Sequence, residues 1–171
     1  MPPRERMSLV QQLLVREVLA RFCRQPYTQP LVRWCTELQD RWMLPHDNGK
    51  DLCDVVGDLQ RAGFPFKPEW FAAHFEFRFP RHGVVGCEGM ELELRHALEP
   101  WPVLGEEPAG GATARYVDAS MERLQVRLSG ITGERHFVNC TGRKRPLRAT
   151  GTPRKVVPGL RAHARTPHAR R

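Results

Sequence analysis

Three segments of the sequence carry acidic and basic side chains at alternate positions, and these residues are the best suited to chemistry. In each segment the polar residues alternate with apolar ones, which is the pattern of a β-strand with one apolar and one charged face. The polar members are His74, Glu76 and Arg78 in residues 74–79, Glu91, Glu93 and Arg95 in residues 90–95, and Arg123, Gln125 and Arg127 in residues 123–128.

A curved sheet with its charged face inward would bring the acids Glu76, Glu91 and Glu93 opposite Arg78, Arg95 and Arg123. Carboxylates at alternate strand positions suit Mg²⁺, which prefers oxygen ligands, and guanidinium groups bind phosphoryl oxygens through paired hydrogen bonds. This composition favours phosphoryl or acyl-phosphate chemistry over nucleophilic hydrolysis. The alternative, which the pattern leaves open, is a sheet with one face on the core and its charged face in water.

The other chemistry-bearing residue types show no comparable pattern. The five cysteines are odd in number and include no Cys-x-x-Cys pair, so neither a zinc ribbon nor a thioredoxin-type motif is present. Gly110-Gly111 is followed by no helix with a lysine, as a phosphate-binding P-loop would require. The histidines show no spacing typical of metal ligands.

The net charge of +8 is confined to one part of the chain. Residues 141–171 contain ten basic residues and no acid, which leaves 17 basic and 19 acidic residues in the rest. Because no aromatic or glycine motif accompanies the basic residues, a nucleic-acid partner is not favoured. No apolar run approaches the roughly 18–20 residues that span a bilayer, and no secretory signal opens the chain, so we expect a soluble, cytoplasmic protein without a membrane partner.

The elements that must position these residues are helices first and strands afterwards. Apolar residues at helical spacing predict helices over residues 8–24, 31–44 and 50–62. The Ser8-x-x-Gln11 pair is typical of a helix start, Gly63 of a helix end, and Pro68 of a short turn. The period then changes to two, which predicts an α+β fold: N-terminal helices followed by a curved antiparallel sheet.

The remaining segments are expected to connect or to follow these elements. Glycines predict a connection between residues 80 and 89 and a flexible loop over residues 105–113. Residues 130–133 predict a hairpin turn into a strand over residues 135–140. From residue 154 the apolar pattern ends, so residues 154–171 are expected to form a basic, disordered tail after a domain of residues 1–153.

Ten short motifs in this order closely resemble the amidoligase domain of large bacterial transglutaminase-like proteins. This domain of unknown function is grouped with carboxylate–amine ligases of the glutamine-synthetase fold, and the resemblance covers roughly residues 2–153. The motifs are LVRW (31–34), MLPH (43–46), DLQRAG (58–63), KPEWF (67–71), HFEFRFP (74–80), ELELR (91–95), ALEPW (97–101), LGEE (104–107), RYVD (115–118) and ERLQV (122–126).

The resemblance implies a glutamine-synthetase-like ligase in which ATP and Mg²⁺ activate a carboxylate as an acyl phosphate that an amine then attacks. The substrates would be a small-molecule or peptide carboxylate and an amine, bound on the concave face of the sheet. By this resemblance the expected catalytic residues are Glu76, Arg78, Arg95 and Arg123, with His74 as a secondary candidate; the nucleotide-binding residues are Arg78, Arg115 and Arg123; and the metal ligands are Glu76, Glu91 and Glu93.

Two departures from the family pattern predict that the chain is a fragment of such a ligase. It begins inside the pattern and leaves it after about Pro153, where the composition resembles a gene read out of frame. The chain alone would then be inactive, or it would need the remainder of a larger ligase or a full-length relative as partner. The alternative is a non-catalytic interaction module that docks through an exposed sheet edge.

Overall fold

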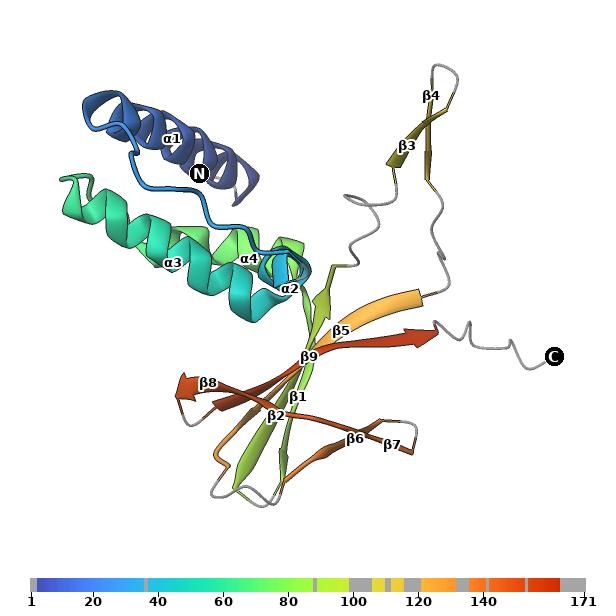
Figure 1. Cartoon of the computed structure of the whole chain (residues 1–171). Helices are drawn as coiled ribbons and strands as arrows, with labels where there is room; N and C mark the ends of the chain where they lie inside the picture. The colour runs from blue at the N-terminus through green and yellow to red at the C-terminus, as the bar shows by residue number, and fades with distance from the viewer. Residues whose placement is uncertain are drawn as a thin grey trace.

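The computed structural model places helices before an antiparallel sheet, which confirms the α+β prediction (Figure 1). It describes residues 3–35, 37–87, 89–98, 106–109, 112–115, 121–131, 136–140, 142–152 and 154–163. The helices are α1 (Pro3–Arg24), α2 (Glu37–Met43), α3 (Pro45–Arg61) and α4 (Ala72–Arg78), with a 3₁₀ turn, η1 (Pro68–Phe71), before α4. None of the helices in these ranges is both long and apolar enough to cross a membrane.

All three predicted helices differ from the prediction at their start; α3 begins at Pro45, five residues before the expected position. Helix α1 begins at Pro3, so the expected capping pair at Ser8 lies inside it, and Glu5 supplies an acidic residue in the first turn. The helix expected over residues 31–44 is confirmed only as α2, because Cys35 has a positive φ of 48° that a right-handed helix cannot contain.

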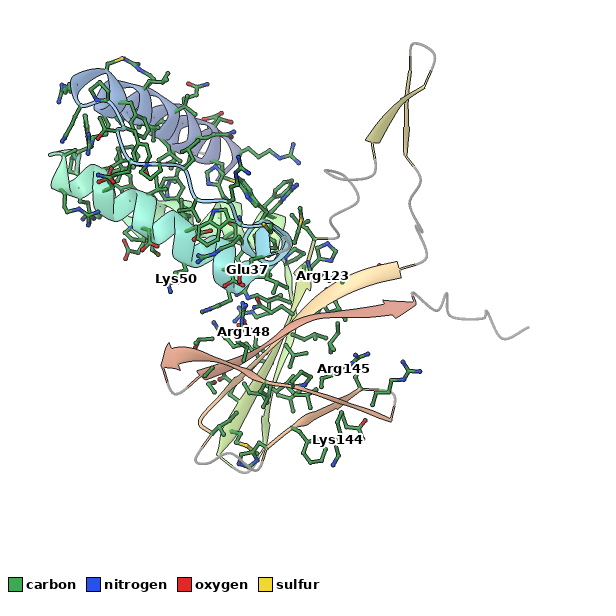
Figure 2. The ribbon with its side chains drawn as sticks, viewed as in Figure 1. Glu37, Lys50, Arg123, Lys144, Arg145 and Arg148 are labelled. Atoms are coloured by element: carbon green, nitrogen blue, oxygen red, sulfur yellow. The ribbon has the colours of Figure 1, made fainter. Side chains whose placement is uncertain are left out.

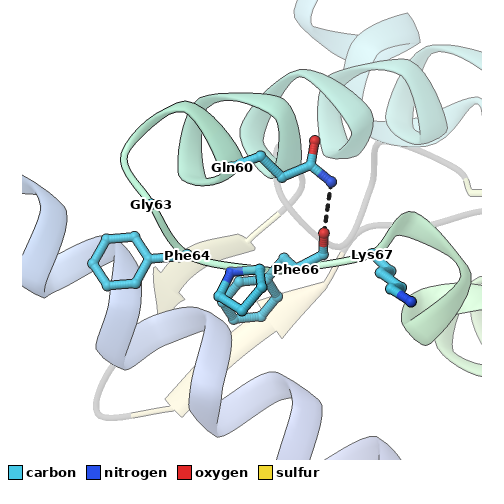
Figure 3. A pocket seen from close by; sticks show the side chains of 6 residues that line it. Gln60, Gly63, Phe64, Phe66 and Lys67 are labelled. Carbon is cyan, nitrogen blue, oxygen red and sulfur yellow. Dashed lines mark hydrogen bonds between the residues drawn. The ribbon is translucent and has the colours of Figure 1, made fainter.

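Helix α3 packs its apolar face against α1. Val56 and Leu59 on α3 are buried together with Val10 on α1. Gly63 follows the helix with a φ of 90°, as the sequence predicted for a helix end. The chain then reverses, and the Nε2 of Gln60 donates a hydrogen bond of 2.6 Å to the carbonyl oxygen of Phe66 (Figure 3).

Residues 72–78 form helix α4, so the strand predicted over residues 74–79 is wrong. Phe71, Phe75 and Phe79 repeat every four residues, and the first and last are only 4% and 1% exposed. Phe77, which completed the apparent alternation, is 80% exposed. The apolar residues of this segment thus follow a helical period, and the turn that begins at Pro68 leads directly into it.

The main sheet has five antiparallel strands in the order β1-β2-β5-β9-β8. Strands β2 and β5 confirm the strands predicted over residues 90–95 and 123–128, whereas β1 lies where a glycine-rich connection was expected. The strands are β1 (Arg81–Cys87), β2 (Met90–Ala97), β5 (Met121–Ser129), β9 (Arg154–His163) and β8 (Arg148–Thr152).

Two short ribbons accompany this sheet. Strands β3 (Glu106–Ala109) and β4 (Ala112–Arg115) pair with each other within the segment that was expected to be a flexible loop. Strands β6 (Val138–Cys140) and β7 (Arg143–Arg145) form the second ribbon. The predicted strand at residues 135–140 is therefore confirmed in part, but it pairs with β7 and not with β5.

Strand β9 overturns the prediction of a disordered tail for residues 154–163. It pairs with β5 on one side and β8 on the other, and Leu160 is 7% exposed. Leu160 is the described apolar side chain that β9 contributes to the core, and the basic residues around it conceal the pattern in the sequence. Residues 164–171 lie outside the described residues.

The two faces of the sheet have different partners. Leu92, Leu94 and Val126 lie on the apolar face, and Val138 and Cys140 of β6 pack against them. The opposite face carries the charged side chains and meets the helices: the amide of Leu98 donates a hydrogen bond to the carbonyl oxygen of Met43, next to helix α3. Each face is therefore covered in part, and the charged face contributes to an interface within the molecule.

Candidate functional site

The middle of the charged face of the sheet is buried. Glu93, Arg123 and Gln125 are 3%, 9% and 2% exposed, although their positions alternate with apolar residues as in a strand with a solvated face. Charged side chains are rarely buried unless they are paired. The partners of these residues therefore define what the face can do.

Glu93 is the centre of an ionic cluster. Its Oε1 accepts a hydrogen bond of 2.8 Å from the Nε of Arg95, and its Oε2 accepts one of 2.9 Å from the Nη2 of Arg127. Glu93 and Arg127 are opposite each other in the β2–β5 register, so the pairing of the strands sets this contact. Arg81 adds a third guanidinium, with its Nη1 4.0 Å from Oε2.

Arg95 connects this cluster to helix α4. Its Nη2 lies 2.7 Å from the Oε1 of Glu76, and its Nη1 donates a hydrogen bond of 3.0 Å to the carbonyl oxygen of Phe79. The hydrogen bond from Arg95 lowers the pKa of Glu76 below its ordinary value, against a smaller opposing effect of burial. Glu76 is therefore ionised at neutral pH and holds Arg95 in place.

The first turn of helix α3 lies beside the same face. The amide of His46 donates a hydrogen bond of 2.8 Å to the Oε1 of Gln125, and Asp47 forms an ion pair of 2.6 Å with Arg148. Figure 2 labels Lys50 and Arg148 at this junction of helix and sheet. Burial lowers the pKa of His46, and the nearby cations Arg148, Lys50 and Arg127 act in the same direction, against Asp47.

The ionic cluster of Glu76, Glu93, Arg81, Arg95 and Arg127 carries one positive charge in excess. Arg95 is only 11% exposed, whereas Arg127 and Arg81 are 30% and 51% exposed and form the side of the cluster that reaches solvent. Guanidinium groups that are partly desolvated and already oriented bind carboxylate or phosphoryl oxygens strongly. This part of the face is chemically suited to an anionic ligand.

A family model described as "Putative amidoligase enzyme" matches residues 1–170. The chain belongs to this amidoligase family. The match includes all of β9. The prediction that the family pattern ends near Pro153 is therefore wrong. Comparisons with the curated proteins and with the solved structures gave no match.

The other predicted site residues of this amidoligase-family chain lie apart from the cluster. Arg78 is exposed at the end of α4, and Glu91 is exposed on β2 without an ion pair to any described side chain. Arg123 is buried, and its Nη1 donates a hydrogen bond of 3.4 Å to the carbonyl oxygen of Leu98. Arg115 pairs with Glu106 in the β3–β4 register, and its side chain lies outside the described residues.

The expected metal ligands do not fit Mg²⁺ in this arrangement. Both carboxylate oxygens of Glu93 accept hydrogen bonds from arginines, and Arg95 joins Glu76 to Glu93 where a shared cation was expected. In the described parts of the chain, no three His, Cys, Asp or Glu side chains come together in a way that could hold a metal ion.

Two residues of the buried face, Gln125 and Arg127, were not among the predicted site residues. Gln125 fixes the first turn of α3, and Arg127 neutralises Glu93. Both follow Arg123 at alternate positions, so the period of two predicts that they lie on the charged face. This alternation was the signal that could have identified them as site residues. The pair of Asp47 and Arg148 spans 101 residues and leaves no local pattern.

Proposed function

We propose that this chain forms the anion-binding part of an ATP-dependent carboxylate–amine ligase. The family match supports the reaction class, and the surplus guanidinium of the buried ionic cluster supports the anion-binding role. In the proposed reaction a carboxylate oxygen attacks the γ-phosphorus of ATP and releases ADP. An amine then attacks the carbonyl carbon of the acyl phosphate, inorganic phosphate leaves, and the nitrogen loses a proton.

In this proposal the arginines of the cluster have different roles. Arg127 and Arg81 are exposed enough to donate hydrogen bonds to phosphoryl oxygens. Arg95 acts as a positioning residue, because Glu76 and Glu93 already use its Nη2 and Nε. Fixed guanidinium groups that reach the charge developing on a transferring phosphoryl group lower the barrier without further reorganisation.

We further propose that the chain is inactive by itself. Magnesium ordinarily accompanies the phosphates of ATP and needs free oxygen ligands; both oxygens of Glu93 are used by arginines, and the Oε1 of Glu76 pairs with Arg95. Residues of a larger ligase or of a full-length relative would supply these ligands. Nucleotide binding, and not turnover, is therefore the property to measure on this chain.

The experiment is calorimetric titration of the full chain with ATP, with and without Mg²⁺. Arg127→Gln should weaken ATP binding at least tenfold, because it removes a charge-assisted donor to the phosphates. Arg61→Gln is the matched control, because Arg61 is 74% exposed at the far end of α3 and should leave the affinity unchanged. Circular dichroism establishes that both variants are folded.

Equal affinity for ATP in the wild type and in Arg127→Gln would contradict the anion-binding role of the cluster, as would an equal loss in Arg61→Gln. Absence of ATP binding by the wild type would contradict it as well. ADP release by the chain alone, in the presence of a carboxylate and an amine, would contradict the proposed inactivity but would support the ligase assignment.

One observation favours the alternative of an interaction module. Strand β1 is an edge of the main sheet, and its Val84 and Val85 are 42% and 62% exposed. An open edge of this kind can pair with a strand of another chain. Co-purification with a full-length relative that Val85→Pro abolishes, without ATP binding, would favour this function over the ligase.

A further inference from the structure

The β6–β7 ribbon presents one of its faces to solvent. Exposure alternates along β6 and the residue before it: Phe137 and Asn139 are exposed, whereas Val138 and Cys140 are half-buried against the apolar face of the main sheet. Lys144 on β7 is the register partner of Asn139, so it lies on the same side of the ribbon. Phe137, Asn139 and Lys144 define the outer face of the ribbon.

A cation and an aromatic ring meet on this outer face. The Nζ of Lys144 lies 4.3 Å from the centroid of the Phe137 ring, and Phe137 is 53% exposed. The sequence pattern did not favour a nucleic-acid partner, because no aromatic motif accompanies the basic residues along the chain. The pairing of β6 with β7 changes this, since it brings an exposed ring beside a lysine seven residues later.

The positive charge of the ribbon is not balanced within the described part of the chain. Arg143, Lys144 and Arg145 are consecutive in β7, and none of them forms an ion pair with a described side chain. The sequence contains no acidic residue after Glu134. Arg148 differs from these three, because Asp47 neutralises it. The described ribbon therefore carries three positive charges without a counterion.

The two arginines of the ribbon flank its outer face. Arg143 is exposed beside the turn, and Arg145 is half-buried, with its Nε buried and without a hydrogen-bond partner among the described residues. Their register partners are Cys140 and Val138 of the inner face (Figure 2 labels Arg145 and Lys144). Both arginines add to the positive potential of the ribbon, which attracts polyanions.

This combination of groups matches single-stranded nucleic acid. Proteins bind single strands by stacking bases on exposed aromatic rings and by holding the phosphates with lysine and arginine. An exposed amide such as that of Asn139 can in addition donate to and accept from the edge of an unpaired base. The outer face thus offers a group for each part of a nucleotide.

Other polyanions match the outer face less well. A two-stranded ribbon can enter the major groove of a duplex, but here Val138 and Cys140 pack against the sheet. An acidic peptide would pair with the cations and leave the ring of Phe137 unused. A lipid surface needs a larger apolar area, and Phe137 is the one large apolar side chain that the described residues 136–152 expose.

We propose that the outer face of the β6–β7 ribbon binds single-stranded nucleic acid. Phe137 stacks on a base through the side of its ring that Lys144 leaves open, and Asn139 forms hydrogen bonds with a base edge. Lys144 and Arg143 pair with phosphates. This inference does not rest on the proposed ligase, because none of these residues belongs to the ionic cluster.

The experiment measures the fluorescence anisotropy of a labelled oligouridylate dodecamer with the full chain at several salt concentrations. Phe137→Ala should weaken binding at least fivefold through the loss of stacking. Lys144→Gln should weaken it and reduce the slope of log affinity against log salt by about 0.7, the value for one phosphate contact of a single strand. Circular dichroism establishes that the variants are folded.

Two matched controls lie in the helical part of the chain. Phe77→Ala removes another exposed phenylalanine ring, and Lys67→Gln removes another exposed lysine charge. Both should leave the affinity unchanged. Affinity in Phe137→Ala or Lys144→Gln equal to that of the wild type would overturn the inference, as would an equal loss in the corresponding control or the absence of binding by the wild type.

An abasic dodecamer, which keeps the phosphates and lacks the bases, isolates the stacking. It should bind more weakly than oligouridylate, and Phe137→Ala should not weaken it further. Equal affinity of the wild type for both dodecamers would overturn the inference. Equal or tighter binding of a double-stranded dodecamer, of a glutamate-rich peptide or of phosphatidylserine vesicles would identify another class of partner and would overturn it too.

The outcomes for the ribbon and for the ligase are separable. Arg127→Gln should weaken ATP binding and leave the affinity for oligouridylate unchanged. Oligouridylate binding that depends on Phe137, in a chain that does not bind ATP, supports the ribbon and contradicts the ligase. Oligouridylate binding that Arg127→Gln abolishes and Phe137→Ala does not affect would place the nucleic acid on the ionic cluster and would overturn the inference.

Discussion

Glu76 on helix α4 and Arg95 on strand β2 form an ion pair of 2.7 Å that joins the helical layer to the sheet. Arg95 then uses its Nε for Glu93, so a single guanidinium links carboxylates from two different elements. The charged face therefore depends on α4 for its geometry. Changes in the cluster are expected to affect both folding and ligand binding.

Replacing Glu93 should destabilise the fold strongly. Glu93→Ala leaves Arg95 and Arg127 without their shared carboxylate in a site where the glutamate itself is 3% exposed. Breaking a buried ion pair by removing one partner costs about 3 kcal/mol or more. Urea titration measures the free energy of unfolding.

The control for this change is Glu91→Ala, on the same face of β2 two residues earlier. Glu91 is exposed and pairs with no described side chain, so the expected change is within about 0.5 kcal/mol. A loss for Glu93→Ala that is no larger than that of the control would show that the cluster does not stabilise the fold.

Burial of His46 should make the stability depend on pH. Because burial lowers its pKa in the folded state, the unfolded chain binds a proton first as the pH falls through the ordinary value of 6.5. The free energy of unfolding should therefore decrease from pH 7.5 to pH 5.5, by up to about 1.4 kcal/mol per pH unit. Urea titrations at both pH values measure the difference.

The variants His46→Gln and His82→Gln assign this dependence to one residue. The first should remove most of the decrease and keep the backbone hydrogen bond to Gln125, whereas the second changes an exposed histidine on β1 and should preserve the decrease. An unchanged decrease in His46→Gln would contradict the assignment.

His74 is a polar residue whose replacement should stabilise the protein. Both of its ring nitrogens are buried without a hydrogen-bond partner among the described residues, and its ring lies 6.0 Å from that of Phe71. His74→Phe removes the unsatisfied groups and preserves an aromatic ring, so the free energy of unfolding should rise by about 1 kcal/mol. Thermal unfolding measures this, with Phe77→His, at an exposed position of the same helix, as a control that should be neutral.

The sequence predicted those elements whose apolar period is unambiguous. Strands β2 and β5 keep a period of two over residues 90–95 and 123–128, and both predicted strands are confirmed. The strand predicted over residues 74–79 was wrong because the phenylalanines fit two periods at once. Phe75, Phe77 and Phe79 fit a period of two, and Phe71, Phe75 and Phe79 fit a period of four. Only the exposure of each side chain in the folded structure distinguishes the two periods, because Phe77 is exposed whereas Phe71 and Phe79 are buried.

The candidate site was less predictable than the fold, because it depends on strand register. The alternation placed Glu93 and Arg127 on one face, but their contact follows from a pairing between residues 34 positions apart. Glu76 was expected to meet Arg95 from within the sheet, and it does so from a helix. The charges of the tail hid β9, which pairs with β5 and buries Leu160.

Gly159 on β9 should be required for the position of Arg123. A methyl group at this glycine would overlap the Nε, Cγ and Cδ of Arg123, the middle of a side chain that is only 9% exposed. Gly159→Ala should therefore displace Arg123 from its hydrogen bond to Leu98 and cost about 1–3 kcal/mol, as overpacking does in other cores. Urea titration measures the cost, and Arg123→Ala provides the second member of a double-mutant cycle.

In the cycle, the double variant should lose less stability than the two single variants together, because the methyl group meets no side chain once Arg123 is shortened. The expected coupling is about 1 kcal/mol or more, within the range for residues in contact. Gly57→Ala, in a helix with only the end of Arg61 nearby, is the control for the substitution itself and should not couple to Arg123→Ala. Additive losses for Gly159→Ala and Arg123→Ala would show that the glycine acts on the strand and not on the arginine.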